Sequence, residues 1–367
     1  MTDPLDPAGV ARVRLWLVEA ALLVPFAASH GTETQRCSTL VEVALASGAT
    51  GWGECPALSR PTYTHEYAAG AWRLLVDELV PAVLAGRGGE IRGHPMARSA
   101  VAAALWDARL REQGRSLADR VAPGRLRRVP RGAVIGRQRV PEATIAAVAA
   151  ALEGGVELVK LKVGSPHDRQ ALVAVRRAFP DVQLAADANG AFSAVPLEEL
   201  RWIDDLHLAY LEQPLAPGDL VGHARLARAL ATPVALDESI DDLDDLATAL
   251  ELGAIEVLNV KAARLGGPHE AIAVIDACAE AGVPAFVGGM LELGVGRALG
   301  AALALRGGCT LPTDLGPSSA YVAEDVSDPV VVDAQGRLVV PGGPGIGVEV
   351  HLQRLAAMSS EVVELRP

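Results

Sequence analysis

The stretch VELVKLKVG at residues 156–164 decides the fold, because it begins a pattern that recurs along the chain. Its short apolar run closes on a charged residue, and so do the later runs LAAD at 184–187, LAYLE at 208–212, VALD at 234–237 and EVLNVK at 256–261. The closing residues stand 25, 25, 25 and 24 positions apart: Lys162, Asp187, Glu212, Asp237 and Lys261. This spacing predicts repeated units of one strand and one helix.

Such units predict a parallel α/β barrel, in which charged residues at the carboxyl ends of successive strands meet at one face. We expect the barrel over residues 126–317, with a last strand or its remnant near CTLPTDLG at 309–316. Residues 1–125 predict a separate α+β unit. The tail, 318–367, predicts short strands and turns that return to pack on that unit. Within the first unit we expect strands at 12–24 and 38–46, and helices at about 64–84 and 95–113.

Composition limits the classes of partner. The chain has 367 residues, of which 50% are hydrophobic, and a formal net charge of −12. That charge argues against nucleic-acid and anionic-membrane surfaces, which are bound mainly by clustered Lys and Arg. No apolar run approaches the roughly 18 residues of a membrane span. The four cysteines lack metal-type spacing and the N-terminus lacks a secretion signal, so we expect a soluble protein of the reducing cytoplasm that acts on a small molecule.

The three acids of the pattern predict a metal site. A single Asp or Glu at a strand end is more often solvated or caps a helix. Three in consecutive units are different, because burying like charges without a cation is very costly. Because side chains along a strand alternate between its two faces, Asp187 shares a face with Ala185, and Asp237 shares one with Ala235. These small neighbours leave room inside the barrel. Oxygen ligands without His or Cys favour Mg²⁺, for which Mn²⁺ can substitute.

The lysines predict two proton carriers. Lys160 and Lys162 lie two positions apart, so both side chains point the same way, either into the barrel or, as a plainer alternative, from an edge strand to solvent. A neighbouring ammonium and desolvation both lower the pKa of a lysine, so we expect Lys162 to act as a base near neutral pH. Lys261 arrives from the opposite side of the sheet. Arg264 either lowers the pKa of Lys261 or is a surface residue at a helix start.

A divalent cation between two amines is suited to removing a proton next to a carboxylate, because the cation stabilises the enediolate that forms. If both amines transfer protons, the product is a racemate. If the substrate carries a β-leaving group, elimination follows. The residues predict the enediolate intermediate more firmly than the choice between racemisation and elimination.

Several motifs together resemble the enolase superfamily, and within it the muconate-lactonizing-like subgroup. They are KLK at 160–162, DANGAF at 187–192, LEQPL at 211–215, LDES at 236–239 and NVKAARLGG at 259–267. Three further stretches resemble the branch that contains o-succinylbenzoate synthases and N-succinylamino acid racemases. These are PFAASHGT at 25–32, GWGECPALSRPTYTHEY at 51–67 and GGMLELGVGRA at 288–298. The resemblance covers nearly the whole chain.

The resemblance implies a modified (β/α)₇β barrel under a capping domain formed by the N-terminal segment and the C-terminal tail. It implies Mg²⁺ on Asp187, Glu212 and Asp237, with acid/base lysines at Lys162 and Lys261. The supporting residues that it implies are Lys160 and Asn189, to which the position of Arg264 adds a third candidate. Near the substrate it implies Phe26 and Tyr63 from cap loops, and Gly289, Met290 and Leu291 beside the distal group.

Three functions follow as hypotheses. The first is a Mg²⁺-dependent hydro-lyase that forms o-succinylbenzoate for menaquinone synthesis, and the second is an N-acylamino acid racemase, with both activities possible in one protein. The third is a barrel that binds a carboxylate without turnover. Family members commonly form homo-oligomers. Two departures from the branch leave the distal substrate group open: Val134 replaces a small hydroxyl residue and Leu293 a smaller polar one, and both changes predict a more apolar pocket.

Overall fold

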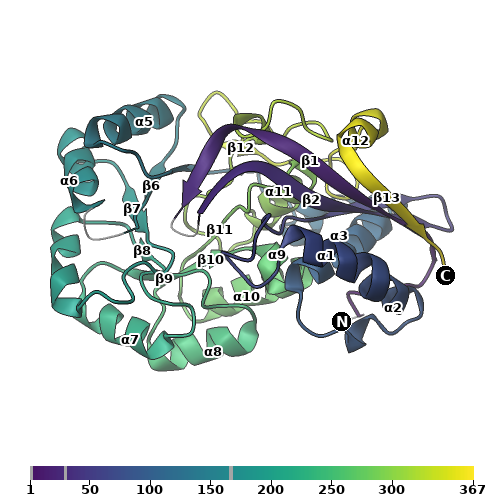
Figure 1. Ribbon diagram of the computed structural model, residues 1–367, viewed down its shortest axis with the longest axis horizontal. Helices are drawn as coiled ribbons and strands as arrows, with labels where there is room; N and C mark the ends of the chain where they lie inside the picture. The colour runs from purple at the N-terminus through teal and green to yellow at the C-terminus, as the bar shows by residue number, and fades with distance from the viewer. Residues whose placement is uncertain (1–2, 29–30, 165–167) are drawn as a thin grey trace.

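The computed structural model describes residues 3–28, 31–164 and 168–367, so positions 29 and 30 of the motif PFAASHGT lie outside the described residues. Two sheets organise the molecule (Figure 1). The first is antiparallel, with the order β13-β1-β2-β3. Its strands are β1 (Val10–Ala28), β2 (Gly31–Leu45), β3 (Thr50–Cys55) and β13 (Ser359–Leu365).

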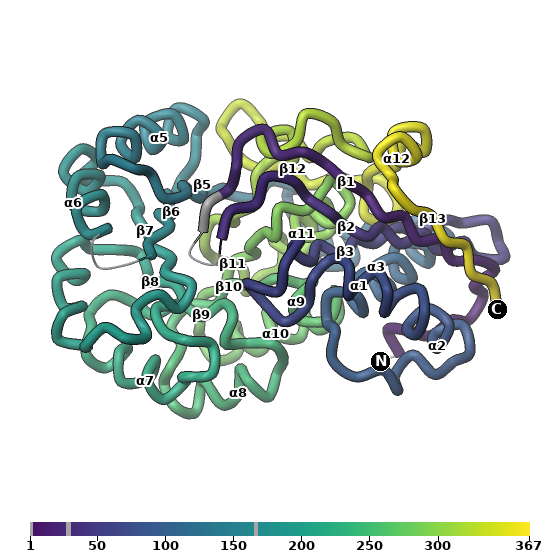
Figure 2. Tube along the Cα trace, viewed as in Figure 1, coloured from purple at the N-terminus to yellow at the C-terminus, as the bar shows by residue number. Residues whose placement is uncertain are grey.

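The last strand of the chain completes the first sheet. Val13 on β1 pairs with Leu365 on β13, so the two ends of the chain share one sheet and lie near each other (Figure 2). Other parts of the tail contact the chain elsewhere, because β12 (Leu338–Val339) pairs with β4 (Arg128–Val129). The remaining tail elements are the short 3₁₀ helix η5 (Ser318–Ala320) and α12 (Leu352–Met358). The tail therefore returns to the N-terminal sheet, as the sequence predicts.

Helices cover one side of this sheet. The predicted helix at 64–84 begins four residues later and is continuous through α1 (Ala68–Leu74), a π-helical turn η1 (Leu75–Leu79) and α2 (Val80–Leu84). A 3₁₀ turn η2 (Gly88–Glu90), α3 (Pro95–Glu112) and α4 (Leu117–Val121) follow. Close packing of α3 on β3 depends on Gly53, where a Cβ atom would lie 2.0 Å from the carbonyl oxygen of Ala100. Only glycine fits at that contact.

The second sheet is the predicted barrel. Its strands run parallel and each pairs with the next along the chain. They are β5 (Gly132–Ile135), β6 (Leu158–Lys162), β7 (Leu184–Asp187), β8 (Leu211–Glu212), β9 (Val234–Leu236), β10 (Val257–Val260) and β11 (Ala285–Val287). The connections carry α5 (Pro141–Glu153), α6 (Arg169–Ala178), the 3₁₀ helix η4 (Leu197–Leu206), α7 (Leu220–Ala229), α8 (Leu243–Leu252), α9 (Ala262–Leu265), α10 (Pro268–Glu280) and α11 (Gly294–Leu303). The α/β class and the capped barrel architecture are confirmed.

Residues 309–313 close the sheet between its first and last strands. Cys309 forms a parallel bridge with Ala285 on β11, and Thr313 forms one with Arg131, just before β5. The backbone N–H of Gly132 also donates to the carbonyl oxygen of Thr313 at 2.8 Å. The predicted remnant of a last strand near CTLPTDLG is therefore confirmed.

A layer of buried side chains fills the barrel beneath the site. Five strands contribute one residue each, and Tyr210 directly precedes β8: the layer consists of Leu158, Ala185, Tyr210, Ala235, Val257 and Phe286. Because side chains on a strand alternate between faces, the residues two positions further on also point inward, one level higher. That level contains Lys160, Asp187, Glu212, Asp237 and Asn259. The apolar layer thus forms the floor on which the polar residues stand.

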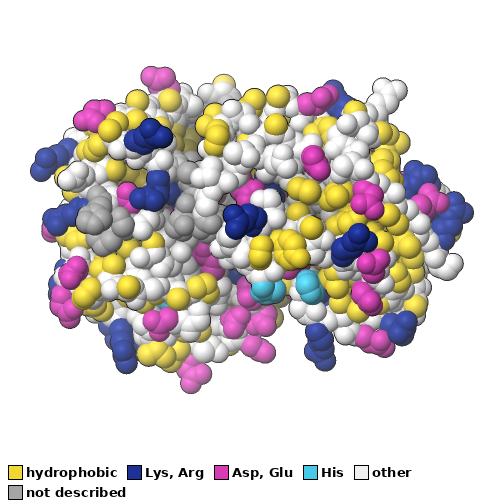
Figure 3. All heavy atoms as spheres, viewed as in Figure 1, with side chains coloured by type: hydrophobic (Ala, Val, Ile, Leu, Met, Phe, Trp, Pro, Cys, Tyr) yellow, Lys and Arg dark blue, Asp and Glu magenta, His cyan; other side chains and the backbone are white. Residues whose placement is uncertain are grey.

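No helix in the described part of the chain is long and apolar enough to cross a membrane. On the face shown in Figure 3, Lys and Arg side chains occur mostly singly among acidic and apolar ones. That face therefore has no broad basic area of the kind that binds nucleic acid.

Candidate active site

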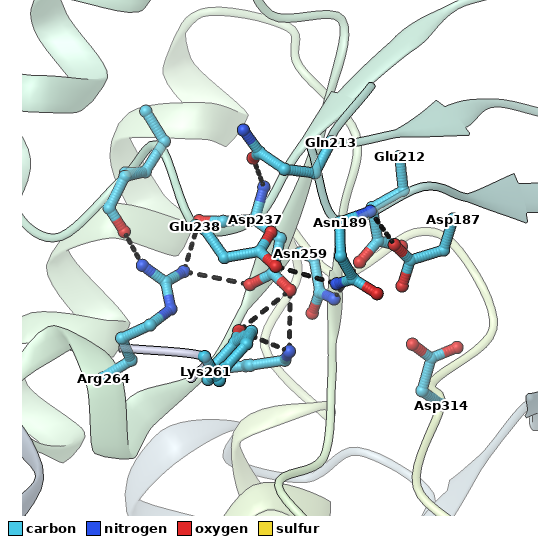
Figure 4. Close-up of polar contacts among 12 residues, drawn as sticks. Asp187, Asn189, Glu212, Gln213, Asp237, Glu238, Asn259, Lys261, Arg264 and Asp314 are labelled. Atoms are coloured by element: carbon cyan, nitrogen blue, oxygen red, sulfur yellow. Dashed lines mark hydrogen bonds and ion pairs between the residues drawn. The ribbon is translucent and has the colours of Figure 1, made fainter. Parts of the chain in front are cut away.

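The three acids of the repeated pattern lie side by side. Asp187 on β7 pairs in register with Glu212 on β8, and Glu212 pairs with Ala235, two residues before Asp237. All three side chains are buried, with at most 1% of any residue exposed. Figure 4 shows Asp187, Glu212 and Asp237 converging from neighbouring strands. The sheet register therefore gathers three carboxylates at one end of the barrel.

Each carboxylate is contacted by a lysine. Lys160 Nζ donates to Glu212 Oε2 at 2.5 Å, Lys162 Nζ to Asp187 Oδ2 at 2.6 Å, and Lys261 Nζ to Asp237 Oδ2 at 2.7 Å. Lys162 ends β6, on one side of the row of acids, and Lys261 follows β10, on the other. Two amines thus flank the acids from opposite sides, while Lys160, two residues before Lys162 on β6, is more deeply buried.

Arg264 belongs to this group of charges and is not a surface residue. It is only 1% exposed, and its guanidinium contacts Asp237 Oδ1 at 3.1 Å and the carbonyl oxygen of Ile240 at 2.7 Å. It also pairs with Asp241 at 2.6 Å. Arg264 therefore holds Asp237 from the side opposite Lys261.

Burial, mutual repulsion and the neighbouring cations together set the pKa values of the acids. Burial raises the pKa of Glu212, and the neighbouring charge of Asp187 raises it further, to about 8. Burial also opposes ionisation of Asp237, but Lys261 and Arg264 outweigh it and lower its pKa below the usual range. One of the three acids thus resists ionisation as long as only protein cations are near.

The groups that surround Lys160 and Lys261 include residues from outside the short motifs that contain these lysines. Burial opposes the charged form of Lys160, but the carboxylates of Asp314 and Glu212 outweigh it and raise its pKa well above the ordinary value. Asp237 and Tyr63 likewise outweigh burial at Lys261 and raise its pKa well above the ordinary value, although the Arg264 cation lies nearby. Nearby carboxylates, Asp314 at Lys160 and Asp237 at Lys261, therefore favour the charged form of both amines.

Sequence reasoning missed residues that support the acids. Asp314, from the segment that closes the barrel, accepts a hydrogen bond from Lys160. Asn259 Nδ2 donates to Glu212 Oε1 at 2.7 Å, and Glu238, also missed, accepts at 2.7 Å from Nδ2 of Asn189, which the sequence had suggested. Asn259 could have been found, because it lies two positions before Lys261 and so shares its face of the strand. No local pattern indicates Asp314.

A cavity opens above the acids and receives side chains from both sheets. The five residues predicted to lie near the substrate all line it, together with the lysines: Phe26, Tyr63, Gly289, Met290, Leu291, Lys160, Lys162 and Lys261. Glu33, Leu58, Arg297 and Tyr321 are additional lining residues. The cavity therefore joins a charged end at the acids to a more apolar end beneath the N-terminal strands.

The comparisons with known proteins agree with this architecture. The family model described as "Enolase C-terminal domain-like" matches residues 143–354. The chain is 39% identical over 348 residues to an o-succinylbenzoate synthase from Geobacillus stearothermophilus, with 92% of each protein covered. It is also 39% identical over 354 residues to an N-succinylamino acid racemase from Thermus thermophilus, covering 94% of this chain and 95% of the relative.

The chain belongs to the enolase superfamily. A solved superfamily structure from Listeria innocua superposes with a TM-score of 0.92 at 34% identity, covering 97% of this chain and 99% of that one. An N-succinyl Arg/Lys racemase from Bacillus cereus superposes with a TM-score of 0.91 at 22% identity, covering 98% of this chain and 100% of that one, which supports the fold alone. The curated relatives thus carry both names that the sequence motifs suggested.

Enolase superfamily enzymes typically use a divalent metal ion. Across residues 3–28, 31–164 and 168–367, no three His, Cys, Asp or Glu side chains are arranged as a formed metal site. The donor set still fits a hard cation, because three carboxylates meet and raise the pKa of Glu212. A divalent cation held by Asp187, Glu212 and Asp237 would offset that repulsion.

The two departures from the family branch have different consequences. Val134 lines the cavity, so an apolar side chain faces the pocket at this position. Leu293 is 1% exposed and packs in the main core, and it is not among the described lining residues. Its backbone N–H, with that of Gly296, donates to the carboxylate of Glu54 on β3, at 2.9 Å each. The prediction for Leu293 was wrong because the residue faces the core at the start of α11.

Proposed function

We propose that this enolase superfamily member is a Mg²⁺-dependent o-succinylbenzoate synthase. The observation that carries the proposal is the placement of Lys162 and Lys261 on opposite sides of three buried carboxylates, at the floor of one cavity. Several relatives that match over most of the chain are named o-succinylbenzoate synthase. The aromatic ring of that product can form when a hydroxylated cyclohexadiene carboxylate loses water.

Asp187, Glu212 and Asp237 would hold the Mg²⁺ ion, since hard oxygen ligands suit it. When bound, the ion supplies positive charge beside the carboxylate of the substrate, which makes the adjacent C–H bond more acidic. The protein's own contribution is to hold these acids in register on three neighbouring strands.

Lys162 is the proposed base. Its neutral amine removes the α-proton, and the C–H electron pair moves onto the substrate carboxylate to give an enediolate. The pair then forms the new ring double bond as the β C–O bond breaks. The resulting ammonium then gives its proton to the departing hydroxyl group, so one water molecule leaves and Lys162 is regenerated. Lys261, from the other side, stabilises with its ammonium the negative charge that develops on the substrate carboxylate. Asn189 Oδ1 accepts a hydrogen bond from Lys162 at 2.8 Å and orients the base.

An N-succinylamino acid racemase is the second candidate. The position of Lys261 favours it, because an amine on the far side of the acids can return a proton to the face opposite Lys162. Relatives of this name reach the same identity as the synthases. The substrate would carry an α-proton but no β-leaving group, so the same proton abstraction would end in inversion.

The two candidates are separated by assays in D₂O with Mg²⁺. Rapid dehydration of the cyclohexadiene substrate, without α-deuterium incorporation into N-succinylamino acids, supports the synthase and eliminates the racemase. Deuterium exchange into both enantiomers without dehydration supports the racemase alone. If neither reaction occurs while the protein still binds Mg²⁺, both catalytic proposals fail and the non-catalytic carboxylate-binding barrel remains.

A further inference from the structure

Tyr63 enters the candidate active site from outside the barrel. It lies in the segment that links β3 to α1, and its side chain reaches the carboxyl end of β10. Lys261 Nζ donates to Tyr63 Oη at 2.8 Å, and Tyr63 Oη donates in turn to Asp237 Oδ2 at 3.1 Å. The Lys261 ammonium also lies 4.8 Å from the centre of the tyrosine ring. The hydroxyl and the ring of Tyr63 therefore both contact one lysine.

The two flanking lysines have matching surroundings. Lys162 Nζ contacts one carboxylate, Asp187, and one neutral oxygen, Asn189 Oδ1, at 2.6 and 2.8 Å. Lys261 Nζ contacts one carboxylate, Asp237, and one neutral oxygen, that of Tyr63, at 2.7 and 2.8 Å. The neutral partner of Lys162 belongs to the barrel, whereas that of Lys261 comes from the N-terminal unit.

We propose that Tyr63 is the positioning residue for Lys261, as Asn189 is for Lys162. The inference rests on the second candidate function, in which Lys261 transfers a proton on the face opposite Lys162. Asp237 is proposed to serve a cation, whereas the hydrogen bond from Lys261 to the Tyr63 hydroxyl uses no oxygen of that carboxylate. The N-terminal unit therefore sets the geometry of one amine, while the barrel alone sets the other.

This arrangement predicts that loss of the Tyr63 hydroxyl slows proton transfer by Lys261 more than proton transfer by Lys162. In Tyr63→Phe the ring stays beside Lys261 but the hydroxyl contact is lost. A hydrogen bond to a charged group contributes about 1.5–3 kcal/mol, which corresponds to a loss of roughly 10- to 100-fold in a rate that depends on it. Proton transfer by Lys261 should fall by that factor. Proton transfer by Lys162, whose amine is held by Asp187 and Asn189, should change less than about 3-fold.

The experiment measures α-proton exchange in D₂O by NMR, with the full chain, Mg²⁺ and each enantiomer of one N-succinylamino acid in turn. Lys162→Ala and Lys261→Ala first establish which enantiomer each lysine deprotonates. Tyr63→Phe should then slow exchange of the Lys261 enantiomer selectively, and Asn189→Ala that of the Lys162 enantiomer. The control is Tyr67→Phe, an exposed tyrosine of the same segment. Equal losses for both enantiomers, or none, would overturn the assignment.

Failure of the proposed function is distinguishable from failure of this inference. If the wild-type protein exchanges neither enantiomer, the racemase chemistry is absent, and the role of Tyr63 is decided by crystal structures of the wild type and Tyr63→Phe with Mg²⁺. Displacement of Lys261 Nζ by more than about 1 Å supports the positioning role, since such a shift is enough to impair catalysis. An unmoved Nζ in the variant overturns it.

Discussion

The Nζ atom of Lys160 lies 2.5 Å from Oε2 of Glu212, across the intervening strand β7. Both residues are almost completely buried. Lys160 also donates to Asp314, so one ammonium serves two carboxylates at the centre of the barrel. Because a buried charge is costly without a partner, this ammonium is a structural requirement as much as a part of the site.

Replacement of Lys160 by Met should therefore destabilise the protein. Two buried carboxylates lose their cation, and the expected loss is about 3–5 kcal/mol in the free energy of unfolding, measured with urea in the absence of divalent ions. Lys162→Met is the matched control, since Lys162 is more exposed and pairs closely with one acid. Similar losses in the two variants would contradict the structural role of Lys160.

Replacement of either flanking lysine by Ala should remove activity without removing the metal site. General acid–base groups contribute about 10²- to 10⁴-fold to rate, so Lys162→Ala should lose at least this factor in dehydration. Lys261→Ala should lose a comparable factor in racemisation. Calorimetric titration with Mg²⁺ should still give binding to both variants. Full activity of Lys162→Ala would refute its role as the base.

Metal removal should lower stability, because the cation offsets repulsion among the acids. At a Mg²⁺ concentration about 100 times the dissociation constant, the wild type should gain about 2.7 kcal/mol over the protein in EDTA, observed as a rise in Tm. Glu212→Gln should show a smaller rise at the same concentration, because it lacks one proposed ligand. If the two proteins respond identically to Mg²⁺, Glu212 is not a ligand.

Glu54 should make stability depend on pH. Burial raises its pKa from 4.5 to about 7, although two backbone N–H groups at the start of α11 oppose the shift. Between pH 4.5 and 7 the folded protein holds a proton that the unfolded chain has released, so this contribution to stability is complete below pH 4.5 and is lost as pH rises through 7. The loss is on the order of 3 kcal/mol.

The measurement is the free energy of unfolding at about pH 5 and about pH 8 for the wild type and Glu54→Gln. The wild type should lose more stability than the variant over this interval, because a glutamine side chain does not titrate. Parallel profiles for the two proteins would show that Glu54 has an ordinary pKa.

Gly53→Ala should weaken the packing of α3 on β3. The added Cβ would lie 2.0 Å from the carbonyl oxygen of Ala100, and backbone there must move. Overpacking of this kind costs about 1–3 kcal/mol or more, which chemical denaturation would detect. Gly218→Ala is the control, since nothing lies within 4 Å of its Cβ position. Equal stability of the two variants would contradict the close approach.

The local sequence carries much of the fold and the identity of the charged residues at the strand ends. Alternation along each strand and a repeat of about 25 residues place Asp187, Glu212 and Asp237 at the same edge of a parallel sheet, whatever the rest of the chain does. The same rule puts Lys160 and Lys162 on one face. These predictions depend only on contacts within a strand or between neighbouring strands, which short motifs encode.

Only the tertiary structure decided the surroundings of those residues. Asp314 contacts Lys160 across 154 positions, and Tyr63 contacts Lys261 across 198. Neither contact exists until the barrel closes through residues 309–313 and the N-terminal unit packs on it. Because Coulomb interactions depend on distance in space and on burial, these remote partners help to raise the pKa values of Lys160 and Lys261, whereas the neighbouring cations in the local motifs would lower them.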